Sequence, residues 1–374
     1  MLSELAAAFI ETHREEALEL LKTIAQIPAP SNREERRMEF CRHWLEEMGA
    51  QGVFTDEAMN VLYPYGVTEN GPVVVFMAHM DVVFPDLTPL PWKEEGGRLC
   101  CPGVGDDTAN LVNILMAAKF VTENGLKPKD AGILFVCNSG EEGLGNLKGS
   151  RKICETYGSR IQAFYSFDGR MDEVISRAVG SHRFLVTART EGGHSYGNFG
   201  RENAIQTLAK VIGDIYAIQV PKEGKTTYNV GTISGGTSVN TIAQEAHMLC
   251  EFRSDNKEGL AFMEKQFRAI FDRPGIEVQL VGERPCENLS PEAEAQREAL
   301  ICQAEARMER ITGKRSKREP GSTDCNIPLS LGIPAVCFGT YYGDGAHTRE
   351  EYVEKDSLEL GYQVAFDTVL SYFQ

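Results

Sequence analysis

The chain has 374 residues, of which 42% are hydrophobic and 25% charged, the balance of a soluble globular protein. Its formal net charge of −16 argues against nucleic acid or an anionic membrane as the main partner, because like charges repel. No apolar run approaches the roughly 20 residues that span a bilayer, and the N-terminus lacks a basic, signal-like segment. We therefore expect a cytoplasmic protein with no membrane partner, whose ten cysteines are mostly reduced thiols.

Helix and strand patterns alternate through the first half of the chain. Apolar residues recur at helical spacing over about 3–24 and 34–48, which predicts two amphipathic helices. A strongly apolar run over 108–121 predicts a buried helix. Runs of apolar and β-branched residues predict short strands. These lie at 60–65, 73–79, 133–137 and 163–167. This succession is typical of an α/β core with a doubly wound, mostly parallel sheet.

The pattern changes near residue 177, where alternating apolar and polar residues predict half-buried strands. The elements of this region follow one another at 181–190, 203–218, 228–234, 245–253, 257–271 and 276–281. Their order, β-α-β-β-α-β, is the ferredoxin-like arrangement. We therefore expect residues 177–288 to form an inserted α+β domain. The larger domain would then be discontinuous and comprise residues 1–176 and 289–374.

The predicted strand at 73–79 ends in a histidine, and Asp81 follows two residues later. Catalytic and binding groups of open α/β sheets gather at the carboxyl ends of the strands. Asp81 could hold one imidazole nitrogen of His79 and leave the other nitrogen for a metal ion. A histidine whose hydrogen bonds are satisfied at a strand end is the alternative interpretation.

Acidic residues follow the other predicted strands. The next two strands lead to Glu141–Glu142 and to Asp168, a loop before a helix holds Asp106–Asp107, and His347 lies near the C-terminus. Imidazole and carboxylate groups suit Zn²⁺ and related ions, and one shared carboxylate would allow two ions. Each group alone has an ordinary explanation, such as a helix cap at Asp106–Asp107 or solvated glutamates. Their common placement after buried strands favours one metal site.

Five stretches, taken together in their order and spacing, resemble the M20 metallopeptidases, the clan of peptidase T, carnosinase-type dipeptidases, aminoacylase and related deacylases. The stretches are Ala78–Asp81, Gly105–Asp107, Ser139–Gly143, Phe167–Gly169 and Gly345–Thr348. The resemblance covers nearly the whole chain. It implies a catalytic zinc-hydrolase domain with an inserted lid or dimerisation domain. Thr108 departs from the pattern, since many relatives carry lysine or methionine there.

The resemblance also implies a set of metal ligands. His79 and Asp168 would bind one ion. Glu142 and His347 would bind the other, and Asp106 would bridge the two. The cofactors implied are two divalent metal ions, with Zn²⁺ first and Co²⁺ or Mn²⁺ as alternatives.

Further roles follow from the same resemblance. Glu141 would be the general base on a metal-bridging water, and would later protonate the leaving amine. Asp81 would orient His79. A cis peptide bond is implied within Asp106–Asp107. The aspartate at Asp168 is typical of the aminopeptidase and dipeptidase branch, whereas deacylases more often have glutamate there.

Three residues of the inserted domain match positions that contact substrate in the family. His194 would help to polarise the scissile carbonyl, and Asn240 would contact the substrate. Arg253 would grip a substrate carboxylate, a bidentate role that suits a guanidinium group. A surface salt bridge is the alternative explanation for Arg253. The loop Gly321–Asp324 resembles a substrate-side loop, or is an ordinary turn.

From these observations we expect a co-catalytic two-zinc metallohydrolase that cleaves the amide bond of short peptides, as an amino-, di- or tripeptidase. The alternative enzyme is an N-acyl amino acid deacylase or carboxypeptidase-type amidohydrolase with the same metal site. A non-catalytic metal-binding protein is the alternative outside enzymes, and the intact Glu141 argues against it. The partner would be a short peptide or an acylated amino acid. The protein would be a monomer or a homodimer formed through the lid.

Overall fold

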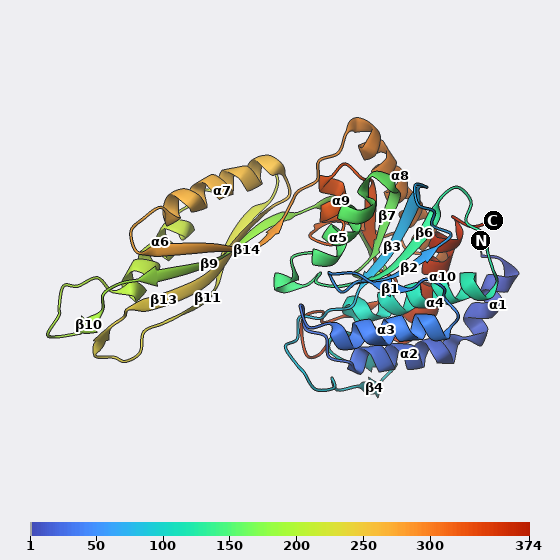
Figure 1. Cartoon of the computed structure of the whole chain (residues 1–374), viewed down its shortest axis with the longest axis horizontal. Coiled ribbons are helices and arrows are strands. Elements are labelled where there is room, and N and C mark those ends of the chain that lie inside the picture. The colour runs from blue at the N-terminus through green and yellow to red at the C-terminus, as the bar shows by residue number, and fades with distance from the viewer. Residues whose placement is uncertain (1) are drawn as a thin grey trace. The chain divides into compact units, whose positions relative to one another are not determined.

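The computed structural model of the protein describes residues 2–374. The chain divides into two compact units (Figure 1). One unit comprises Met1–Arg177 and Asn288–Gln374, and the other is the continuous segment Ala178–Glu287. None of the helices in the described residues combines the length and apolar character that a membrane span needs.

The first unit is built on an eight-stranded sheet in the order β1-β2-β6-β3-β7-β16-β8-β15. The strands are β1 (Phe54–Thr55), β2 (Val61–Tyr65), β3 (Val73–His79), β6 (Gly132–Asn138), β7 (Ile161–Phe167), β8 (Glu173–Ala178), β15 (Lys317–Gly321) and β16 (Ala335–Phe338). The central strands β6, β3, β7 and β16 are parallel, whereas β2 and β8 pair antiparallel to their neighbours. This confirms the α/β fold class that the sequence predicts.

Strand β3 lies in the middle of this sheet, and all seven of its residues are buried. Such burial on both faces explains why its sequence is an unbroken apolar run rather than an alternating one. Its residue Phe76 stacks on Tyr165 of β7, with ring centroids 5.1 Å apart. The apolar run therefore places the polar residue at its end, His79, at a fixed point on the sheet edge.

Helices accompany this sheet. They are α1 (Glu4–Thr12), α2 (Arg14–Gln26), α3 (Glu35–Glu47), α4 (Asn110–Glu123), α5 (Lys148–Tyr157), α8 (Pro291–Thr312), α9 (Asn326–Ser330) and α10 (Ser357–Leu370). The buried helix α4 packs against β3, β6 and α10. The single helix predicted at 3–24 is wrong, because His13 leaves helical geometry with φ −103° and ψ 13° and separates α1 from α2. The two pieces then pack on different partners, α1 on α10 and α2 on α4.

A small antiparallel sheet in the same unit joins two distant parts of the chain. Its order is β17-β18-β5-β4. The strands are β4 (Lys93–Glu95), β5 (Arg98–Cys100), β17 (Gly343–Asp344) and β18 (Tyr352–Glu354). All of them are too short for the sequence pattern to predict. Their pairing brings the segment that follows Cys100 beside the segment that surrounds His347.

The second unit has a four-stranded antiparallel sheet in the order β11-β13-β9-β14. Its elements in chain order are β9 (Gly180–Arg189), β10 (Gly193–His194), α6 (Ala204–Tyr216), β11 (Thr226–Gly235), β12 (Thr241–Ile242), β13 (Glu245–Ser254), α7 (Lys257–Phe271) and β14 (Ile276–Arg284). Apart from the short pair β10–β12, this is the predicted order β-α-β-β-α-β. Asn203 and Asn256 cap the two helices through their side chains. Phe252 and Phe267 join sheet and helix, with ring centroids 4.9 Å apart.

Candidate metal centre and active site

The polar residues of the site lie where parallel strands of the first unit end. Strand β3 pairs in parallel with β6 and with β7. His79 lies opposite Asn138 of β6, and Met77 lies opposite Ser166 of β7. The residues just beyond these strands, Glu141 and Asp168, therefore emerge at the same edge as His79. This is the edge at which open α/β sheets place their functional groups.

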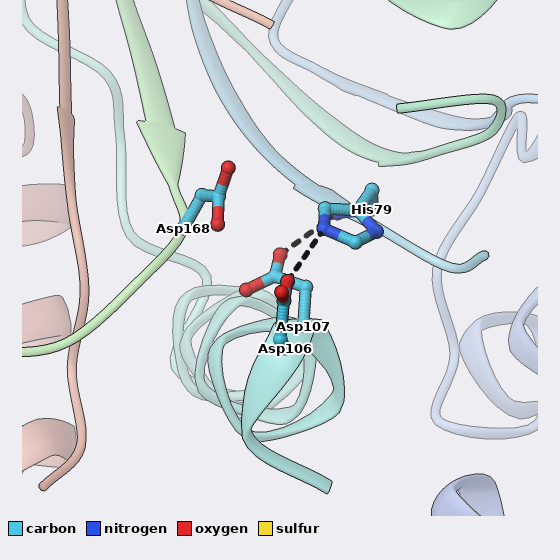
Figure 2. Close-up of side chains that lie close together, drawn as sticks. All are labelled: His79, Asp106, Asp107 and Asp168. Carbon is cyan, nitrogen blue, oxygen red and sulfur yellow. Dashed lines mark hydrogen bonds and ion pairs between the residues drawn. The ribbon is translucent and has the colours of Figure 1, made fainter. Parts of the chain in front are cut away.

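Asp106 lies between the two histidines. Its Oδ1 is 3.1 Å from Nε2 of His79, and its Oδ2 is 3.1 Å from Nε2 of His347. The same Nε2 of His347 is 2.9 Å from Oε1 of Glu142. Figure 2 shows His79 pointing toward Asp106 and Asp107, with Asp168 beside them. One carboxylate thus faces two imidazole groups, each through a different oxygen.

Three overlapping groups of side chains in the described residues could hold a metal ion, and the offered atoms of each lie within 4.8 Å of one another. The groups are His79 with Asp106, Asp107 and Asp168; His79 with Glu141 and Glu142; and Asp106 with Glu142 and His347. Imidazole nitrogens and carboxylate oxygens are the donors that divalent ions such as Zn²⁺ take. The residues present therefore fit a centre for divalent ions. The three groups include all five residues that the sequence predicts as ligands.

The electrostatics of the cluster are those of a site that needs a cation. Burial and the charge of Asp106 raise the pKa of Glu142 to about 7. Burial and nearby carboxylates also hold the pKa of Asp168 well above its usual range. Hydrogen bonds to Asp106 and Glu142 raise the pKa of His347 to about 11. Without a metal ion, the repulsion between these carboxylates is offset in part by His79 and His347 and otherwise relieved by protonation.

Asp107 is a buried part of the cluster to which the sequence assigned no role. One carboxylate oxygen accepts the backbone N–H of His79 at 2.9 Å, and the other accepts the side-chain amide of Asn110 at 2.6 Å. The predicted cis peptide bond between Asp106 and Asp107 is present. Asp107 therefore ties the turn that carries Asp106 to the end of β3.

Asp81 supports both sides of the site. Its backbone carbonyl is 2.9 Å from Nδ1 of His79, and its carboxylate oxygen Oδ1 is 3.5 Å from the same nitrogen. Because a carbonyl oxygen can only accept, Nδ1 carries the proton and Nε2 keeps its lone pair in the neutral ring. The carboxylate also accepts the backbone N–H groups of Glu141 and Glu142, and the hydroxyl of Ser31 at 2.7 Å.

Arg37 is a fully buried guanidinium beside the site that the sequence did not single out. It donates to the backbone carbonyl oxygens of Ile27 at 2.7 Å and Met80 at 2.9 Å. It also donates to the hydroxyl of Thr108 at 3.2 Å, and Thr108 in turn donates to the carbonyl of Gly103 at 2.5 Å. The departure from the family pattern at Thr108 is thus part of a hydrogen-bonded support for the Asp106 turn.

The substrate-side loop predicted at Gly321–Asp324 contributes one buried carboxyl group. Oδ2 of Asp324 accepts the side-chain amide of Asn138 at 2.6 Å, at the end of β6. Burial and the charge of Glu141 raise the pKa of Asp324 to about 7. The residue therefore supports the strand end that precedes Glu141.

In the second unit, His194 and Asn240 lie close together. His194 pairs with Thr241, and the backbone carbonyl of Asn240 accepts the N–H of Ser195 at 2.9 Å. Nδ1 of His194 accepts the backbone N–H groups of Tyr196 and Gly197, at 3.3 and 3.2 Å. The ring proton of the neutral His194 is therefore on Nε2, where it can be donated.

Arg253 is not near those two residues within this unit. It lies toward the far end of β13 and pairs with Ser181. Its Nε and Nη2 donate to Glu251 at 2.8 and 3.2 Å, and Arg183 is 3.2 Å from the same carboxylate. The salt bridge that was the alternative explanation for Arg253 is thus present. A guanidinium has five donors, so this pairing leaves others for a ligand.

Comparison with known proteins identifies the family. The sequence matches the family described as "Peptidase family M20/M25/M40" over residues 75–371. The "Uncharacterized protein YqjE" of Bacillus subtilis is 25% identical over 314 residues, which cover 80% of this chain and 81% of that protein. The "Succinyl-diaminopimelate desuccinylase" of Nitrosomonas eutropha is 29% identical over 260 residues, 62% of this chain and 66% of that one.

The fold is also that of solved structures. The dipeptidase Dug1p of Saccharomyces cerevisiae superimposes with a TM-score of 0.75 at 15% identity, covering 98% of each chain. The family match spans most of this chain and includes every residue of the metal cluster. The protein therefore belongs to the M20/M25/M40 peptidase family and is a metallohydrolase of its peptidase and amidohydrolase class.

Proposed function

We propose that the protein hydrolyses an amide bond in short peptides, as an amino-, di- or tripeptidase, with two divalent ions as cofactors and Zn²⁺ as the first choice. One observation carries this proposal. The two oxygens of Asp106 face Nε2 of His79 and Nε2 of His347, each at 3.1 Å. A carboxylate between two such donors is placed to bridge two ions, with Asp168 on one side and Glu142 on the other.

Glu141 is the proposed general base. It is 5% exposed, it follows β6, and its backbone N–H is held by Asp81 at 3.0 Å. Two divalent ions bound at the cluster would polarise the scissile carbonyl and lower the pKa of a water molecule. The carboxylate of Glu141 would take the proton of that water and later return it to the nitrogen of the leaving amine.

The second unit would supply the substrate contacts. Nε2–H of His194 would donate to the scissile carbonyl oxygen, and Asn240, whose backbone carbonyl accepts the N–H of Ser195, would contact the substrate beside it. Arg253 would bind the free carboxylate of the substrate. A free carboxylate at the end of a short chain is a feature of unblocked peptides, which supports peptides as the substrate class.

The spacing within the second unit supports a homodimer. Arg253 lies eight residues beyond Glu245 in β13, about 26 Å at the rise of a strand. His194 pairs with Thr241, on the other side of Glu245. A dipeptide spans only about 7 Å. A single copy of this unit therefore does not bring both residues to one short substrate, and a second copy of the chain would supply one of them.

Deacylation of an N-acyl amino acid is the second candidate, because a relative at 29% identity is named as a desuccinylase. A substrate panel with Zn²⁺ or Co²⁺ added separates the two. The panel contains a dipeptide, a tripeptide, an N-blocked tripeptide and N-acetyl and N-succinyl amino acids. Cleavage of the free-amine peptides alone supports the peptidase. Cleavage of the acylated amino acids instead would move the protein to the deacylases, and turnover of no amide at all would contradict both.

A further inference from the structure

His347 belongs to a loop that has little structure of its own. The loop joins β17 to β18, in which Asp344 pairs with Tyr352. His347 has φ 66°, a left-handed conformation that is unusual for a residue other than glycine and persists only where the surroundings hold it. Residues 346–350 are exposed. The position of this proposed ligand therefore depends on what anchors the ends of its loop.

Glu351 is the last residue of this loop before β18, and it is buried, with 2% of its surface exposed. Its Oε2 accepts the backbone N–H of Gly103 at 2.7 Å. Its Oε1 accepts the backbone N–H groups of Gly105 and Asp106, both at 2.8 Å. One carboxylate thus joins the His347 loop to the turn that carries Asp106, two segments about 245 residues apart in the sequence.

The turn is shaped to receive this carboxylate. Successive N–H groups that converge on one point form a concave anion site in the backbone. Gly103 has φ 78°, and a Cβ atom there would come within 2.4 Å of the side chain of Val82. A side-chain amide cannot replace the carboxylate, because it has one accepting oxygen and its NH₂ group would face an N–H donor.

We propose that Glu351 is a positioning residue of the metal centre. It fixes the positions of Asp106 and His347 relative to each other, so that both can bind one ion together with Glu142. This inference rests on the proposed two-ion centre. Glu351 is not itself a ligand in this arrangement, since both of its oxygens are occupied by backbone N–H groups. Its effect would therefore be on the affinity of the ion at His347, before any effect on substrate.

The test compares Glu351→Gln with Glu350→Gln, which changes the neighbouring exposed glutamate in the same way. Full-length protein is stripped of metal, and Co²⁺ or Zn²⁺ binding is measured by competition with a chelator. The melting temperature of each metal-free protein is recorded as well. We expect the wild type and Glu350→Gln to bind two ions alike. Glu351→Gln should bind the ion at His347 about 10–100-fold more weakly. Because Asp106 is the proposed bridge, the affinity of the other ion should also fall, but by less.

A purely structural role would give a different result. Glu351→Gln would then melt at a lower temperature without metal but bind two ions with wild-type affinity, and the proposal would be overturned. If Glu351→Gln does not fold, Glu351→Asp keeps the charge on a shorter side chain and decides the question by the same measurement. A wild type that binds no second ion would instead contradict the proposed two-ion function, so the two failures are distinct.

Discussion

The carboxylate of Asp81 accepts the backbone N–H of Glu142 at 2.9 Å, through Oδ2. Its other oxygen, Oδ1, accepts the backbone N–H of Glu141 at 3.0 Å. The residue that orients His79 thus also fixes the segment that carries the proposed base and a proposed ligand. Burial would raise the pKa of Asp81, but the hydrogen bond and charge of His79, with hydrogen bonds from Ser31 and from the backbone of Glu142, hold that pKa below its usual value.

Replacing Asp81 with asparagine tests this double role. The amide of the new side chain would present an NH₂ group to one of the two backbone N–H donors, so the Glu141–Glu142 segment would shift. We expect metal affinity and kcat/KM to fall about 10–100-fold. Asp130→Asn, an exposed change before β6, is the control. Equal metal affinity and activity in both variants would contradict the role.

Glu141→Gln separates chemistry from metal binding. A glutamine keeps the shape of the side chain but cannot take a proton from water. We expect kcat to fall by about 10²–10⁴-fold, while the number of bound ions stays at the wild-type value. Kinetics on the best peptide of the panel, with elemental analysis of the same samples, provide the measurement. Unchanged turnover would rule out Glu141 as the base.

Metal binding should release protons. In the metal-free protein, hydrogen bonds to Asp106 and Glu142 raise the pKa of His347 to about 11, so the ring is protonated at pH 8. Only the neutral ring can bind a metal ion, so binding displaces this proton, and affinity rises as pH rises toward that pKa. Calorimetry in two buffers of different ionisation enthalpy measures the release. A buffer-independent heat would contradict the prediction, and His347→Asn should remove this contribution.

Subunit complementation tests the proposed homodimer. We expect His194→Ala and Arg253→Ala each to lose most peptidase activity. When the two variants are mixed and allowed to exchange subunits, some dimers contain one intact site, so activity returns. Mixing His194→Ala with the double variant His194→Ala/Arg253→Ala leaves no intact His194 and serves as the control. Full monomer mass in solution, or no recovery on mixing, would contradict the homodimer.

Arg37→Met should destabilise the first unit. Burial lowers the pKa of Arg37 to about 10, so the guanidinium stays charged at neutral pH. Its removal leaves the buried carbonyl of Met80 and the partly buried carbonyl of Ile27 without this donor, at a cost of roughly 2–4 kcal/mol. Urea unfolding of the metal-free protein measures the loss. Arg36→Met, on the exposed side of α3, should change stability by less than about 0.5 kcal/mol.

Several features could be predicted because they depend on short stretches of sequence. Strand β3 is an unbroken apolar run, and its burial on both faces follows from that run alone. Parallel strands end at one edge of a sheet, so the sequence alone predicts that His79, Glu141 and Asp168 meet there. The second unit was predictable for the same reason, since alternation and helical spacing are local patterns.

Other features were beyond sequence patterns. The helix predicted at 3–24 breaks at His13 because its two halves pack on different helices. The short strands β5 and β18, each of three residues, carry no periodic signal, although their pairing sets the course of the His347 loop.

The sequence by itself therefore determined the family, the α/β fold and the set of candidate ligands. These features depend on local runs of apolar residues and on short motifs at the ends of strands. Only the tertiary structure decided which groups support those ligands. These supports are hydrogen bonds between segments that are distant in the chain. Asp107 accepts the backbone N–H of His79, Arg37 donates to the carbonyl of Met80, and Glu351 accepts the backbone N–H of Asp106. Such contacts depend on where loops cross, and a buried charged group is informative only once its partners are known.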